Sequence, residues 1–100
     1  MRRGTTPTHI FTLPFGEEMI QTIKVYYAQG GEVVLAKDKE SCLFEGNSVM
    51  VSLSQEETLL FDENVWVEIQ IRVLTLGGQA LASDIMRVNC LDVLSDEVLA

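Results

Sequence analysis

The sequence predicts an all-β protein: a two-sheet immunoglobulin-like β-sandwich of about seven strands with one short helical turn. Three observations support this fold class. Residues 65–75 alternate apolar and polar side chains with a period of two, which is typical of a strand with one buried face. Short turns containing glycine separate the apolar stretches, and no strand–helix–strand alternation occurs. About seven strands in one hundred residues favour a sandwich over a closed barrel.

Residues 65–75 contain the clearest strand pattern of the chain. Five β-branched residues occupy every second position, and the residues between them are mostly polar. We expect the β-branched set to form core: Val65, Val67, Ile69, Ile71 and Val73. The opposite face of the same strand would then present Trp66, Glu68, Gln70, Arg72 and Leu74.

The amino-terminal part predicts two strands. Residues 1–7 are polar, and we expect them to be frayed. Residues 9–13 can form a first strand that ends at the proline and glycine of residues 14–16. Residues 19–29 form the second, in which Ile23, Val25 and Tyr27 alternate with Thr22, Lys24 and Tyr26.

The middle of the chain predicts a meander of short strands. Gly30 and Gly31 signal a tight hairpin turn because glycine reaches positive φ without steric strain, and residues 32–37 return as a strand. Residues 42–44 are a weaker candidate, and residues 48–53 place Val49, Val51 and Leu53 on one face.

The helical turn is predicted at residues 55–60. Ser54 and Glu57 have the spacing of a capping box, and Leu59 and Leu60 follow as apolar residues to bury. Such a segment is too short to be a stable helix alone, so we expect one or two turns between two sheets.

Residues 80–94 predict the last strand, after a turn at residues 76–79. The apolar side chains change parity after Ser83, which predicts a β-bulge near Ser83 and Asp84.

Length and charge restrict the possible functions. One hundred residues predict a single domain that spans residues 1–100. Fifteen acidic residues against seven Lys and Arg give a formal net charge of −8, which disfavours nucleic acid as a partner. The charge is explained either by solubility or by an acidic face that meets a basic partner.

The chain predicts folding in the cytoplasm without a signal peptide. The polar residues 4–9 lie where a signal peptide needs an apolar region, and no apolar run is long enough to span a membrane. Cys42 and Cys90 are too few for a disulfide scaffold, so we expect buried free thiols. The spacing of antibody cysteines around a core tryptophan is absent.

No catalytic, cofactor-binding or metal-binding residues are predicted, and the chain is not expected to be an enzyme. His9 is the only histidine and has no motif around it. The carboxylates at residues 56–63 and 38–45 lack the spacing of a calcium loop, and we interpret them as solvated loop charge.

The candidate docking face consists of residues on the outward parity of two strands: Trp66, Tyr26, Gln70, Arg72 and Leu74. Exposed aromatic and apolar side chains on one sheet face are typical of a protein interface. The alternative is that the helical turn or the first strand covers this face. Both interpretations stay open at the level of sequence.

Three stretches of the chain carry a resemblance: MRRGTTPTH at residues 1–9, LSQEETLLF at residues 53–61, and the hairpin of residues 67–74 and 80–83. They resemble small uncharacterised prophage-encoded proteins of Gram-positive gut bacteria. The strand pattern is similar to the immunoglobulin-like amino-terminal modules of siphophage baseplate proteins. The resemblance covers nearly the whole chain, but it contains no catalytic motif and transfers no site residues.

The resemblance implies a structural or accessory β-sandwich of phage origin. We therefore expect a non-enzymatic interaction module, associated with the virion, tail or baseplate, whose partners are other phage structural proteins or further copies of itself. The alternative is a small carbohydrate- or ligand-binding module that uses Trp66, Tyr26 and nearby acids.

Overall fold

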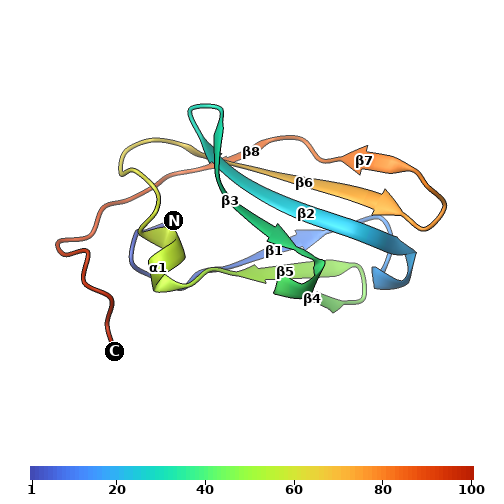
Figure 1. Cartoon of the computed structure of the whole chain (residues 1–100), viewed down its shortest axis with the longest axis horizontal. Coiled ribbons are helices and arrows are strands. Elements are labelled where there is room, and N and C mark those ends of the chain that lie inside the picture. Colours follow the sequence, from blue (N-terminus) through green and yellow to red (C-terminus); the bar gives the residue numbers. More distant parts are fainter.

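The computed structural model describes residues 1–100 as two antiparallel β-sheets packed face to face (Figure 1). The small sheet has the order β1 (Thr8–Thr12), β5 (Ser48–Ser52), β4 (Cys42–Glu45). The large sheet has the order β3 (Glu32–Asp38), β2 (Ile20–Gln29), β6 (Val67–Thr75), β7 (Ala80–Ala82), and β8 (Met86–Val88) also pairs with β6. This arrangement confirms the all-β two-sheet sandwich.

Three short helices connect the strands. They are the 3-10 helices η1 (Glu17–Met19) and η2 (Lys39–Ser41) and the α-helix α1 (Gln55–Thr58). Ser54 caps α1 as the spacing predicts: its hydroxyl accepts from the Glu57 amide, and the Glu57 carboxylate accepts from the Ser54 amide. The buried residue of the turn is Thr58, however, and Leu60 is exposed, because the chain reverses after one turn.

The core lies between the two sheets and follows the alternation of the strands. From β2 it takes Ile23, Val25 and Tyr27, and from the small sheet Val49 and Val51. The four alternate residues of β6 are buried as expected: Val67, Ile69, Ile71 and Val73. Each such side chain contributes about 1.5–3 kcal/mol when it leaves water, so the alternation determines which face turns inward.

The prediction that Val65 belongs to this core is wrong. Val65 is 40% exposed and lies in the loop that leads into β6. The Gln29 amide donates to the carbonyl oxygens of Asp62 and Val65 at 2.8 and 3.2 Å, which occupies the Val65 carbonyl. Asn64 adopts a positive φ of 63° in the same loop. The strand therefore begins only at Val67.

The last predicted strand is divided into β7 and β8 by the expected bulge. Arg72 pairs with Ala82 and Ile69 pairs with Met86, so two residues of β6 face three residues of the other strand. The Ser83 hydroxyl accepts from the Ile71 amide at 3.0 Å in place of a backbone carbonyl. This division gives eight strands instead of about seven.

Residues 1–7 are held against the body of the protein, although the sequence predicts a frayed segment. Arg2 forms a parallel bridge with Leu91, and the Arg3 amide donates to the Leu91 carbonyl at 2.9 Å. The Arg3 residue is only 9% exposed. Its partners come from loops far away in the sequence, which is why the polar composition of this segment is misleading.

Candidate functional site

The outer face of the large sheet carries most of the predicted docking residues. We define this outer face by the outward side chains of β2 and β6, which alternate with the core residues: Lys24, Tyr26, Ala28, Glu68, Gln70, Arg72 and Leu74. The register pairs Lys24 with Arg72 and Tyr26 with Gln70. Since β1 belongs to the other sheet, it does not cover this face.

Two cations on the outer face have no polar partner within the chain. Neither the Lys24 ammonium nor the Arg72 guanidinium makes an ion pair or a hydrogen bond. The other five Lys and Arg side chains each make at least one such contact. Like charges at directly opposite positions of an antiparallel pair are destabilising. The strand pairing thus holds two unpaired positive charges together on a protein of net charge −8.

One acidic residue flanks this pair on the other side. Asp38 of β3 is the cross-strand partner of Lys24. The pKa of Asp38 is lowered, first by the hydrogen bond from the Ser41 hydroxyl and also by the charge of Lys24. Asp38 is thereby committed to capping η2, where its carboxylate accepts from the Ser41 amide.

Two shallow hollows lie on the outer face, and Tyr26 and Arg72 line both of them. The first has a volume of about 290 Å³ and is also bordered by Val33, Gln70 and Ile85. The second has a volume of about 260 Å³. Its other lining residues are Thr22, Lys24, Val73, Leu74 and Ala80. Glu68, which pairs with Arg87, also borders the first hollow, whereas Lys24 borders the second. Tyr26 and Arg72 therefore form the centre of a surface with an apolar floor and a charged rim whose unpaired members are cations.

The structure brings together four of the five predicted docking residues. Tyr26, Gln70, Arg72 and Leu74 border these two hollows. Gln70 is partly committed to the fold, because its amide donates to the Ser83 carbonyl at 3.0 Å and supports the bulge.

Trp66 does not belong to this group. It precedes β6, is 54% exposed, and lines a separate hollow with Asn64, Val65, Asn89, Cys90 and Leu91. Tyr26 and Trp66 consequently do not form one stacking platform, which the carbohydrate-binding alternative would use.

Sequence reasoning missed Lys24 on the outer face and Ile85 at the edge of the first hollow. Lys24 shares the parity of Tyr26, but only the register of β2 against β6 places it beside Arg72. Ile85 is 57% exposed at the edge of the first hollow because the bulge lifts residues 83–85 out of regular pairing. The alternation of β2 could have indicated Lys24, whereas nothing local indicated Ile85.

His9 lies between the two sheets rather than in a cleft. Its Nδ1 atom is 2.7 Å from the Tyr27 hydroxyl, and the two rings are tilted with centroids 5.5 Å apart. Burial lowers the pKa of His9 and raises the pKa of Tyr27. Neither side chain lines any of the hollows described above. The pair acts as a polar bridge within the core.

Both cysteines are buried and free, as expected. Burial raises the pKa of the Cys42 thiol and of the Cys90 thiol, which lowers the thiolate fraction of each. The Cys42 thiol donates to the Asp38 carbonyl at 3.2 Å.

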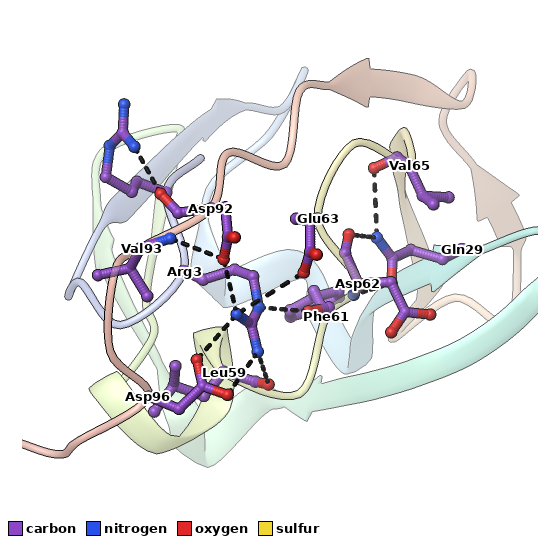
Figure 2. A network of polar contacts seen from close by, with 11 residues as sticks. Arg3, Gln29, Leu59, Phe61, Asp62, Glu63, Val65, Asp92, Val93 and Asp96 are labelled. Carbon is purple, nitrogen blue, oxygen red and sulfur yellow. Dashed lines mark hydrogen bonds and ion pairs between the residues drawn. The ribbon is translucent and has the colours of Figure 1, made fainter.

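A second polar cluster surrounds the Arg3 guanidinium (Figure 2). Its nitrogens donate to the Phe61 carbonyl at 2.7 Å and to the Leu59 carbonyl at 3.2 Å. They also contact the carboxylates of Asp92 and Asp96, each at 3.0 Å. The hydrogen bond that Arg3 donates to the Asp96 carboxylate is the largest cause of the raised pKa of Arg3. This cluster joins the amino-terminal segment, the loop before β6 and the carboxy-terminal segment.

No group of three His, Cys, Asp or Glu side chains is arranged to hold a metal ion. None of the helices has the length and apolar character needed to cross a membrane.

Comparison of the chain with protein-family models, curated proteins and solved structures gives no match.

Proposed function

We propose that this chain is a non-enzymatic interaction module that docks to other proteins through the outer face of the large sheet. The observation that carries the proposal is the unpaired cation pair of Lys24 and Arg72 beside the two hollows. A partner that supplies negative charge and apolar side chains would relieve the repulsion and fill the hollows at the same time.

The central residues of the outer face are of the types that contribute most to protein interfaces. Tyr and Arg are enriched among residues whose truncation weakens binding by more than about 2 kcal/mol. Tyr26 is half-buried and rigidly placed in the middle of β2, so little conformational entropy is lost when a partner covers it. Arg72 is exposed and reaches both hollows.

The proposed setting is a phage particle. The resemblance of residues 1–9 and 53–61 to prophage-encoded proteins supports an accessory component of a virion, tail or baseplate. In that setting the partners are other phage structural proteins or further copies of this chain.

The test uses the intact chain and the proteins encoded by the genes that flank its own. Each pair is mixed and analysed by size-exclusion chromatography with light scattering. We expect at least one complex, and we expect Tyr26→Ala combined with Arg72→Ala to remove it. The matched control is Thr12→Ala combined with Ser52→Ala, two exposed positions on the small sheet, which should leave the complex intact.

Two outcomes would contradict the proposal. One is the absence of any complex, whether with flanking gene products or between copies of the chain. The other is a complex that the control variant and the outer-face variant weaken to the same extent.

A further inference from the structure

Residues 94–99 form an arm that is attached to its own copy at two points, through the Leu99 backbone and the Asp96 side chain. The Gln55 side-chain amide donates to the Leu99 carbonyl at 3.0 Å and accepts from the Leu99 amide at 2.8 Å. The Asp96 carboxylate is held by Arg3 at 3.0 Å. The arm is therefore positioned before any partner binds, which reduces the entropy lost on docking.

The arm presents apolar side chains and a free carboxylate to solvent. Leu94 is completely exposed, Leu99 is 72% exposed, and Val98 is 42% exposed. The Glu97 amide donates to the Ser95 hydroxyl, but the Glu97 carboxylate has no partner. An exposed apolar segment with an unpaired acid is the chemical complement of an apolar surface with unpaired cations.

The arm and the outer face lie on different parts of the molecule. Figure 1 shows the carboxy-terminal segment descending past α1 on the side of the small sheet, away from the outer side of β2 and β6. An arm held by Gln55 and Arg3 cannot cover the outer face of its own copy without leaving both attachments. While both attachments are kept, the complementary surfaces can meet only between two copies.

We infer that the arm of one copy docks on the outer face of a second copy, with Glu97 against Arg72 and Lys24 and with Leu94 and Leu99 on the hollows. The inference rests on the proposed function and names a partner for the same surface. Because donor and acceptor surfaces differ, two copies can exchange arms reciprocally in a two-fold dimer, or the contact can repeat head to tail into a ring or an open chain. An arm of six residues makes a small contact, so association is weak and depends on concentration.

The experiment is a charge-exchange cycle on the intact chain. Sedimentation equilibrium at 50 mM salt measures the association constant of the wild type, Arg72→Glu, Glu97→Lys and the double variant with both changes. Reversal of either charge replaces an attraction with a repulsion, so each single variant should weaken association about tenfold. The double variant restores opposite charges and the wild-type net charge, and association should return to within about threefold of wild type.

A control variant separates the local pairing from the effect of net charge. Glu45→Lys changes the charge by the same amount as Glu97→Lys, at an exposed position on β4. It should leave association within about twofold of wild type. Because the contact depends on charge, 500 mM salt should weaken the wild type and the double variant alike.

Three results would overturn the inference: a monomeric wild type at millimolar concentration, an unchanged association constant in Arg72→Glu, or no recovery in the double variant. A monomeric wild type that still binds a flanking gene product through Tyr26 and Arg72 overturns only the self-association and leaves the proposed function standing. If that binding is missing as well, both proposals fail.

Discussion

At the scale of single residues, Arg3 is the side chain whose role differs most from its sequence context. It lies in a polar amino-terminal segment, yet its guanidinium donates hydrogen bonds to two backbone carbonyls in the segment after α1, those of Leu59 and Phe61. Because Asp92 and Asp96 are mostly exposed, Arg3 stabilises the fold more through its hydrogen bonds to the two carbonyls than through its ion pairs.

Arg3→Gln should lower the free energy of unfolding by about 1–3 kcal/mol, because the Phe61 and Leu59 carbonyls lose their donors in a buried place. Urea denaturation followed by tryptophan fluorescence measures the change. The matched control is Arg2→Gln, the same substitution at the adjacent exposed position, which should change stability by less than about 0.5 kcal/mol. Equal losses in the two variants would contradict the role assigned to Arg3.

His9 should make stability depend on pH in a defined window. Burial lowers its pKa from the ordinary value of 6.5, so the unfolded chain binds more protons than the folded one as the pH falls through 6.5. Stability is therefore complete above this pH and decreases below it. His9→Gln should flatten the dependence between pH 7 and about 5.5 in urea denaturation. An unchanged slope would show that other groups cause the dependence.

At the scale of elements, the alternation of β6 decides how the large sheet is oriented. Ile71 has its side chain in the core, whereas Ile10 of β1 is 65% exposed on the outer side of the small sheet. The two residues are chemically identical, so any difference between their variants reports burial alone.

Ile71→Ala should lower the free energy of unfolding by about 2–5 kcal/mol, through lost burial and the cavity left behind. Ile10→Ala should change it by less than about 0.5 kcal/mol. Guanidinium denaturation of both variants under the same conditions provides the comparison. A small effect at Ile71 would mean that the two sheets do not pack through this face of β6.

The β2–β3 hairpin depends on glycine for a conformational reason. Gly30 has a φ of 58° and Gly31 a φ of 82°, and no atom would contact an added Cβ at either residue. Any loss on substitution therefore comes from the left-handed backbone and not from a clash.

Gly30→Ala should destabilise the protein by about 1–2 kcal/mol in thermal denaturation. Gly77→Ala serves as the control, because Gly77 has no positive φ and its added Cβ would meet only Thr75 at an ordinary 3.9 Å. The control should be neutral or stabilise by up to about 1 kcal/mol. Similar losses at both glycines would argue against the positive-φ turn.

At the scale of the whole molecule, the two thiols report the integrity of the sandwich. Cys42 lies on the small sheet, and Cys90 lies in the segment that follows β8. Both are buried, so a reagent reaches them only when the structure opens.

The thiol reagent DTNB should therefore react at least about 100-fold more slowly with the folded chain than with the chain in denaturant. Two thiols per chain should react after denaturation. Absorbance at the wavelength of the released thiolate measures both rates. Rapid reaction of one thiol in the native protein would place that cysteine in a locally open region.

At the same scale, the net charge of the chain bears on the proposed contact between the arm and the outer face. A chain with a charge of −8 repels further copies of itself unless specific cations meet specific acids. Lys24 and Arg72 are the cations that the fold leaves without a polar partner, and the Glu97 carboxylate on the arm also has none. Such an arrangement favours one orientation of approach over others.

The local features of this protein were determined by the sequence. The alternation of Val67, Ile69, Ile71 and Val73 predicts a strand with one buried face. A helix cannot bury every second side chain, because its side chains repeat about every 3.6 residues. The capping box of Ser54 and Glu57 and the glycine hairpin depend on contacts within a few residues. Local pattern is sufficient for features of this kind.

The tertiary structure alone decided everything that joins distant parts of the chain. Arg3 is buried because residues 59–61 and 92–96 surround it, and Val65 leaves the strand because Gln29 binds its carbonyl. Lys24 meets Arg72 through a register set by the whole β2–β6 ladder, while Trp66 lies before β6 and lines a different hollow. The physical reason is the same in each case: the energy of these contacts depends on partners that no local pattern specifies.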